Sequence, residues 1–391
     1  MTPHPPQSTA ASRSVIRLHY FLYFGLLGAY LPYFNLYCYH LGFSGMQIGL
    51  LNAVRSVTLV VFPLLWGILA DRYHARRAIF VLCSGLSALL WSGYLLTVDF
   101  LMMLVITALY GVFFAPLISF LEAFTMDALG RRRQHYGTVR VWGSISFIAT
   151  VLLLGRLVDR YSLALIVKVI LAGSVVMFLL ASFLRRTGRG TARSMADGCR
   201  ALLRPRVTGF LLGAFLMLVS HGAYYGFFSI HLEQLGFDRT FIGVCWALAS
   251  TAEIVVMVSA GRLLQRLSVE TVLVWSFPVA VLRWVITALV TGGPAILAVQ
   301  LLHAVTYGAF HVASILYMDR LSPAAVKTMG QAVNNAVTYG LGLMTGFFLS
   351  GWGYAALGTG RLFALSGAVA LLGGVLMYAV VRRPGPVEGN G

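Results

Sequence analysis

The sequence is a succession of apolar blocks, each about 20 residues or longer, separated by short polar stretches. A block of that length spans the hydrocarbon core of a bilayer as one helix, because a helix rises about 1.5 Å per residue and the core is about 30 Å thick. Twelve such blocks predict an all-α polytopic membrane protein. We place the twelve transmembrane helices at residues 16–40, 46–69, 78–97, 100–126, 136–157, 163–184, 207–232, 239–264, 269–291, 294–318, 328–350 and 360–381.

Composition excludes most other classes of protein. Charged residues make up 10% of the chain and hydrophobic residues 59%, whereas a soluble domain carries about 25% charged residues. The net charge of +17 does not indicate nucleic acid, because Lys and Arg gather at the ends of the apolar blocks. The four cysteines have no metal-ligand spacing. Without a metal cluster, a nucleophile elbow or a phosphate loop, we expect no enzyme activity, no metal and no cofactor.

Basic residues predict the orientation and the domains. The sparse side of the predicted spans holds only Arg156, Arg160, Arg239 and Arg361. The positive-inside rule therefore predicts an inner-membrane protein with both termini cytoplasmic. We predict a cytoplasmic tail at 1–15, an N-terminal six-helix bundle at 16–184, a cytoplasmic linker at 185–206, a C-terminal six-helix bundle at 207–381 and a cytoplasmic tail at 382–391. Ser194 to Asp197 fits a capping box, so the linker is either a short surface helix or a plain solvated connection.

Two acidic residues lie deep in the apolar blocks, and each has an arginine at the same predicted depth. Glu122 and Arg140 lie about nine residues before and after the turn at 131–133, on what we predict to be an antiparallel helix pair. Glu253 and Arg283 lie about 15 residues either side of the turn near Ser268. Charges at this depth are costly and face a partner or a wet cavity. The pairs are either structural salt bridges or part of a polar cavity between the two halves.

Other polar and aromatic residues leave more than one interpretation open. His303 and His311 lie on one predicted helix with Tyr307 between them, either as satisfied core residues or as proton carriers. Arg55 can hold a substrate carboxylate, pair with an acid or serve the structure. Asn35, Tyr33 and Tyr225 either line a binding cavity or pack between helices. The pairs Gly45/Gly49 and Gly342/Gly346 permit close helix approach.

One loop carries a family resemblance. Residues 67–77 read GILADRYHARR after the second predicted span, and residues 261–266 read GRLLQR one six-span unit later. The first loop resembles the signature loop of the major facilitator superfamily. The resemblance implies two pseudo-symmetric six-helix bundles, transport by alternating access, and a gating role for Gly67, Asp71 and Arg72.

Two closer resemblances concern the substrate. Glu122-Ala-Phe and Tyr136-Gly-x-x-Arg140 resemble the same region of lactose permease, with the same interval between the Glu and the Arg. That resemblance implies that Glu122 and Arg140 hold substrate, that Phe147 replaces a stacking Trp, and that Glu253 links substrate to proton with His303 or His311 as the span-ten His. The runs LRW at 282–284 and QLLHAVTYGAFHVA at 300–313 resemble the 3-phenylpropionate permease group.

We therefore expect a proton-coupled symporter that imports a small organic solute, with an aromatic acid such as 3-phenylpropionate favoured. The expected substrate-binding residues are Glu122, Arg140, Phe147, Arg55, Asn35, Tyr33 and Tyr225. The expected proton-coupling residues are Glu253, Arg283, His303 and His311. The expected partners are the solute, protons and lipid, with the protein a monomer. The alternatives are a sugar or nucleoside proton symporter, a drug or metabolite efflux carrier, and a transport-dead receptor or scaffold.

Overall fold

The structure, a computed structural model, describes residues 10–130, 135–184, 204–323 and 326–382. Several predicted features lie outside the described residues: most of both tails, the turn at 131–133, and most of the 185–206 linker with its Ser194 capping box.

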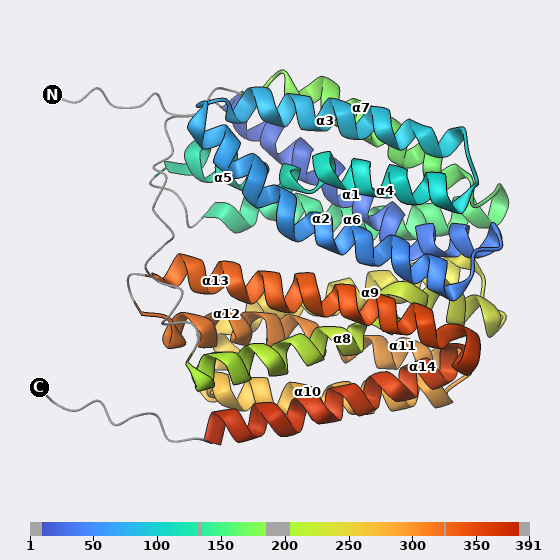
Figure 1. Ribbon diagram of the computed structural model, residues 1–391, viewed down its shortest axis with the longest axis vertical. Coiled ribbons are helices and arrows are strands. Elements are labelled where there is room, and N and C mark those ends of the chain that lie inside the picture. Colours follow the sequence, from blue (N-terminus) through green and yellow to red (C-terminus); the bar gives the residue numbers. More distant parts are fainter. Residues whose placement is uncertain (1–9, 131–134, 185–203, 324–325, 383–391) are drawn as a thin grey trace, which may run out of the picture. The chain divides into compact units, whose positions relative to one another are not determined.

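The described chain is almost entirely helical, and the predicted all-α polytopic architecture is confirmed (Figure 1). The helices are α1 (Ala10–His40), α2 (Gly45–Arg72), α3 (Arg76–Ser92), α4 (Phe100–Phe114), α5 (Pro116–Leu129), α6 (Tyr136–Arg160), α7 (Leu165–Ala181), α8 (Pro205–Gln234), α9 (Arg239–Arg266), α10 (Val269–Leu289), α11 (Gly293–Leu301), α12 (Phe310–Leu321), α13 (Lys327–Asn335) and α14 (Leu343–Arg382).

The helices account for twelve crossings. Among the described residues, ten helices are long and apolar enough to span a membrane, and α7 is a shorter apolar helix. The stretch Met329–Arg382 has 54 residues, which at 1.5 Å per residue is about 80 Å and more than twice the thickness of the hydrocarbon core. Gly358 interrupts it with a φ of 68°, a left-handed conformation that glycine adopts without strain. Two crossings from this stretch and one from α7 bring the total to the predicted twelve.

Contacts divide the chain into two compact units. The first comprises Met1–Phe43, Val57–Arg193 and Asp238–Ala247, and the second comprises Ser44–Ser56, Ser194–Phe237 and Leu248–Gly391. Each unit thus follows one half of the sequence but includes the beginning of one helix from the other half. Helix α2 begins in the second unit, and α9 begins in the first. The predicted bundles at 16–184 and 207–381 do not include this exchange.

In the first unit, small residues bring α1 and α6 into close contact. A Cβ on Gly28 would lie 2.9 Å from the backbone oxygen of Phe147, and one on Gly25 would lie 2.7 Å from Oγ of Ser146. An indole also connects α3 to α7, since Nε1 of Trp91 donates to the backbone oxygen of Val167 at 2.9 Å.

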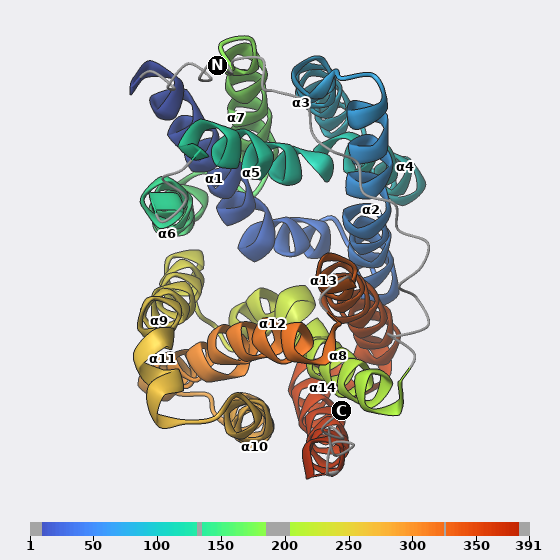
Figure 2. The same ribbon diagram turned by 90° about the vertical axis from the view of Figure 1, so that its left-hand side faces the viewer.

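In the second unit, α8 and α14 lie side by side (Figures 1 and 2). A Cβ on Gly222 would meet the backbone of Gly346 at 2.2 Å, so the two backbones touch directly. The start of α2 packs as closely on α14, because a Cβ on Gly49 would lie 2.6 Å from the backbone oxygen of Phe347 and 2.8 Å from Cα of Gly351. These contacts are the close approaches expected of small residues on membrane helices.

Two helices of the second unit change to π-helical geometry at Ala304–Ala309 and at Ala336–Gly342. π-Helical turns are rare and occur most often at functional sites. The first separates α11 from α12, and the second separates α13 from α14. Both lie beside the polar residues described next.

Candidate functional site

The most deeply buried charge of the second unit is Arg283 on α10, whose accessible surface is 0%. Its guanidinium donates to Nδ1 of His303 at 3.0 Å, to Oγ1 of Thr306 at 3.1 Å and to Oε1 of Gln300 at 3.5 Å. Its Cζ also lies 4.3 Å from the ring centroid of Tyr224. These partners are all uncharged side chains. Within the described part of the chain, Nε of Arg283 has no hydrogen-bond partner.

His303 connects this arginine to Glu253 on α9. Arginine only donates hydrogen bonds, so Nδ1 of a neutral His303 is the acceptor and Nε2 carries the proton. Nε2 lies 3.6 Å from Oε2 of Glu253, close enough for an electrostatic contact but too long for a hydrogen bond. The side chain of His303 is 5% exposed and that of Glu253 is 23% exposed. Of the three groups, Glu253 is therefore the one most open to exchange a proton with water.

Local structure positions both charged residues of the cluster, Arg283 on α10 and Glu253 on α9. Helix α10 begins after Ser268, whose Oγ accepts from the backbone N–H of Thr271 at 3.1 Å and caps the helix. The π-helical segment at Ala304–Ala309 follows His303 directly and contains Gly308. A Cβ on Gly308 would lie 3.2 Å from Cγ of Glu253, so α9 packs here against a position without a side chain.

An aromatic cage surrounds the cluster. The ring of Tyr224 lies 5.5 Å from that of His303, and the rings of Tyr225 and Tyr307 lie 6.3 Å and 5.1 Å from it. His221 of α8 packs edge-on against Trp284 at 4.9 Å. Tyr225, predicted to bind substrate, thus lies beside His303.

His311 lies two turns beyond His303. The ring of Tyr307 stacks between the two imidazoles, 5.1 Å from His303 and 6.2 Å from His311. Nδ1 of His311 hydrogen-bonds to the hydroxyl of Tyr339, which lies in the second π-helical segment. The structure therefore brings together all four of the predicted proton-coupling residues, with Glu253, His303 and Arg283 in one chain of contacts and His311 beside them.

The predicted pair in the first unit is arranged differently. Among the described residues, no ion pair joins Glu122 to Arg140: Glu122 accepts from the hydroxyl of Tyr136 at 3.4 Å, and Arg140 lies over the ring of Phe24 at 4.0 Å. Glu122 is exposed and Arg140 is half-buried. The sequence predicted that Glu122 and Arg140 lie at one depth, but it could not show that the guanidinium of Arg140 stacks on the ring of Phe24 from α1.

The other predicted substrate-binding residues are mostly packed. Tyr33 is fully buried and donates to the backbone oxygen of Val151 at 2.6 Å, which makes it a link between α1 and α6. Phe147 and Asn35 are buried, and Arg55 is half-buried on α2.

The predicted gating loop contains an ion pair with a different arginine. Asp71 accepts from Nε of Arg76 at 3.0 Å and from its Nη2 at 2.7 Å, and Arg76 also reaches Asp127 at 3.8 Å. Arg72, which is also predicted to have a gating role, lies over the ring of Tyr73 at 5.9 Å. A Cβ added to Gly67 would meet nothing within 4 Å.

Two polar members of the cluster were missed from the sequence. Gln300 and Thr306 lie three residues before and three after His303, and the side-chain oxygen of each accepts a hydrogen bond from Arg283. Positions three apart share one face of a helix. That spacing within QLLHAVT was the available signal.

Comparison with known proteins agrees with the architecture. The family profile described as the MFS_1 like family matches residues 14–365. A probable 3-phenylpropionic acid transporter of Escherichia coli (strain K12) is 30% identical over 90% of this chain and 93% of its own. The maltose permease of Geobacillus stearothermophilus is 26% identical over 89% and 90% of the two chains.

Solved structures show the same fold. The crystal structure of the nucleoside transporter NupG matches with a TM-score of 0.88 at 16% identity, and the match covers 96% of this chain and 100% of that one. As the sequence predicted, these relatives are transporters rather than enzymes. The chain therefore belongs to the MFS_1 like family, and it is a membrane transporter of the major facilitator superfamily.

Proposed function

We propose that this transporter imports a small aromatic carboxylate together with a proton by alternating access, as a monomer in the inner membrane with both termini cytoplasmic. The observation that carries the proposal is the chain of contacts from Glu253 through His303 to Arg283. The relative described as a probable 3-phenylpropionic acid transporter makes 3-phenylpropionate the favoured substrate.

Charge balance explains how such a chain couples the two solutes. With Glu253 ionised, its charge offsets that of Arg283 and the cluster is neutral. A proton on Glu253 removes that charge and leaves the buried guanidinium uncompensated, which costs about 1–3 kcal/mol because Glu253 is partly exposed to water. A substrate carboxylate restores the balance. Proton and anion therefore favour each other's binding, and either the empty ionised carrier or the fully loaded one is ready to reorient.

Arg283 has a position at which a carboxylate can bind. Its hydrogen bond to Gln300, at 3.5 Å, is the longest of its three and the weakest by distance. A carboxylate that displaces Oε1 of Gln300 would gain a charge-assisted bond to the guanidinium. The rings of Tyr224 and Trp284, whose centroids lie 4.3 Å and 4.5 Å from Cζ of Arg283, make the surroundings of the guanidinium aromatic.

Arg140 remains the predicted second contact for the carboxylate. It is half-buried, and its guanidinium lies over the ring of Phe24 at 4.0 Å. Replacement of Arg140 and of Arg283 by Gln in separate variants distinguishes the two contacts. The variant that raises KM for 3-phenylpropionate identifies the arginine that holds it.

The deciding experiment separates the two components of the proton-motive force. Purified protein in proteoliposomes is given labelled 3-phenylpropionate with either a pH gradient, acid outside, or a potassium diffusion potential, negative inside. One monovalent anion and one proton carry no net charge. We expect the pH gradient to drive accumulation and the membrane potential to have no effect on it.

The matched control is Glu270→Gln, a change of the same kind at an acid of the second unit that pairs with Arg320 at 3.2 Å, away from the cluster. It should transport like the parent protein, whereas Glu253→Gln should not accumulate substrate. Accumulation by Glu253→Gln under a pH gradient would refute the proposed role of this cluster.

A neutral sugar or nucleoside is the second candidate, favoured by the maltose permease among the relatives. A neutral solute with a proton carries one positive charge. Its uptake would therefore be stimulated by a potential negative inside, so the same experiment, repeated with maltose and uridine, separates the two candidates.

A further inference from the structure

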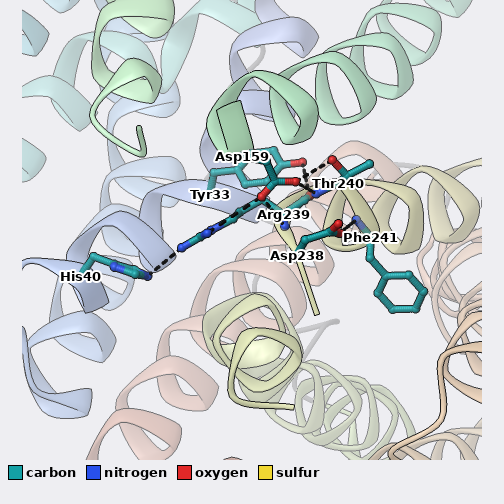
Figure 3. Close-up of polar contacts among 7 residues, drawn as sticks. All are labelled: Tyr33, His40, Asp159, Asp238, Arg239, Thr240 and Phe241. Atoms are coloured by element: carbon teal, nitrogen blue, oxygen red, sulfur yellow. Dashed lines mark hydrogen bonds and ion pairs between the residues drawn. The ribbon is translucent and has the colours of Figure 1, made fainter. Parts of the chain in front are cut away.

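The last turn of α6 contacts the beginning of α9, and both segments belong to the first unit (Figure 3). Oδ1 of Asp159 accepts from the backbone N–H of Arg239 at 2.9 Å. Its Oδ2 accepts from the backbone N–H of Thr240 at 2.8 Å and from the Thr240 hydroxyl at 2.6 Å. Nη1 of Arg239 also lies 3.9 Å from Oδ1. One carboxylate thus makes three hydrogen bonds and an ion pair to another helix.

The contact between α6 and α9 near this carboxylate is tightly packed. A Cβ on Gly243 of α9 would lie 2.4 Å from the backbone oxygen of Val151 and 2.6 Å from the hydroxyl of Tyr33. A Cβ on Gly155 of α6 would lie 2.6 Å from the backbone oxygen of Arg239. The first turns of α9 therefore pack against α6 with no room for a methyl group on either side.

Two aspartates accept hydrogen bonds from the first backbone N–H groups of α9. Asp238 accepts from the backbone N–H of Phe241 at 2.7 Å, which is a local cap within one helix. Asp159 takes the N–H groups of Arg239 and Thr240 from a different helix. The positive end of the helix dipole favours both carboxylates, but only Asp159 ties α9 to α6.

Helix α9 also carries Glu253, fourteen residues beyond Arg239 and about 21 Å along the axis. Its first residues, to Ala247, belong to the first unit, and the rest of the helix belongs to the second. We propose that Asp159 is a latch that holds the first turns of α9 on α6, and that its release is a step of the transport cycle. The inference deepens the proposed function, because the helix that is released is the one that bears the proton-binding acid.

Cys245 provides a native reporter of the latch. It lies in the latched segment and is 0% exposed. Parent protein, Asp159→Asn and Asp238→Asn, each in detergent micelles, would be treated with a membrane-impermeant maleimide, and labelling at Cys245 followed by mass spectrometry of its peptide. Cys83 on α3, also 0% exposed, reports general unfolding in the same sample.

An amide at position 159 keeps one acceptor oxygen but loses the charge and one hydrogen bond. We expect Asp159→Asn to raise the labelling rate of Cys245 about tenfold, with Cys83 unchanged. Asp238→Asn, which also removes a negative charge from the start of α9 but keeps a capping oxygen and leaves Asp159 in place, should leave the rate at the parent value. Thr240→Val, which removes one hydroxyl and no charge, should give a smaller increase, and it serves as the second variant if Asp159→Asn does not fold.

Two outcomes would overturn the latch. The first is unchanged Cys245 labelling in folded Asp159→Asn and Thr240→Val proteins. The second is an equal increase in Asp238→Asn, which would mean that loss of a negative charge at the helix start, rather than loss of the tie to α6, exposes Cys245. Labelling needs neither substrate nor a proton gradient, so its failure leaves the proposed symport untouched, and failure of symport leaves the labelling result standing.

Discussion

Arg283 donates a 3.0 Å hydrogen bond to Nδ1 of His303, and this bond determines which ring nitrogen of a neutral His303 carries the proton. Because the guanidinium cannot accept, the proton of a neutral His303 lies on Nε2, which faces Glu253. The imidazole therefore transmits the charge state of a partly exposed acid to a fully buried base. The following predictions test this arrangement and the packing that supports it.

Replacement of Glu253 by Gln should abolish proton-driven accumulation but preserve exchange. The carboxamide is permanently neutral, as the protonated acid is, so the loaded carrier can still reorient in both directions. We expect counterflow of labelled 3-phenylpropionate against unlabelled substrate to continue in proteoliposomes while net uptake under a pH gradient falls to background. A variant that loses exchange as completely as uptake would indicate that Glu253 binds substrate instead.

The stability of the same variant should depend on Arg283. Glu253→Gln leaves a buried guanidinium without its acid, which we expect to cost about 1–3 kcal/mol because Glu253 is partly exposed to water. The double variant Glu253→Gln with Arg283→Met removes both charges and should recover most of the loss. The apparent Tm in detergent, measured for the parent protein and for each variant, gives these losses of stability. Equal losses in the single and the double variant would contradict the proposed charge balance.

Gly308→Ala should slow transport without unfolding the protein. The added methyl would meet Cγ of Glu253 at 3.2 Å and its backbone oxygen at 3.4 Å, so the acid must shift by a few tenths of an ångström. We expect the transport rate to fall about three- to tenfold, since misplacement of an active group by about 1 Å can cost a hundredfold. Gly261→Ala on α9 is the control, because a Cβ there would meet nothing within 4 Å.

Two glycines of α2 should respond in opposite ways to the same substitution. A Cβ at Gly49 would lie 2.6 Å from one backbone oxygen of α14, and we expect Gly49→Ala to lower stability by about 1–3 kcal/mol. Gly67 has open space around it, so Gly67→Ala should be neutral or stabilise by up to about 1 kcal/mol through helix propensity. Thermal unfolding of the two purified variants compares them directly. A strong loss of transport in a stable Gly67→Ala protein would support the predicted gating role of that glycine.

The gating loop should depend on Arg76 more than on Arg72. Arg76 holds Asp71 at 2.7 Å and approaches Asp127, whereas Arg72 lies over a neighbouring tyrosine ring. We expect Arg76→Gln and Asp71→Asn each to reduce initial uptake rates, with no further reduction in the double variant. Arg72→Gln should stay within about twofold of the parent rate. The reverse order of effects would restore Arg72 as the gating arginine.

The sequence predicted the architecture because apolar block length is a strong physical constraint. It also predicted that Glu253 and Arg283 belong together, from their equal distances to the turn near Ser268. It could not predict His303 as the bridge between them. That contact depends on how α9, α10 and α11 pack. It also depends on the π-helical turn at Ala304–Ala309, which no pattern in the sequence predicted.

The first unit shows the same dependence on neighbouring helices. Equal depth made Glu122 and Arg140 a plausible pair, yet Arg140 lies over Phe24 of α1, a helix distant in sequence. Tyr33 was predicted to face substrate among the aromatics of the first span, but its hydroxyl is bonded to the backbone of α6. Depth can be read from one helix, whereas the facing residue depends on the neighbouring helices.

The division of α2 and α9 between the two units has a consequence for assembly. A polypeptide that ends at Arg193 would lack Asp238–Ala247, which belong to its own compact unit, and the other fragment would lack Ser44–Ser56. Each fragment would thus lack a segment that belongs to its own unit, and we expect the two fragments to be more stable when they are synthesised together than when each is made alone.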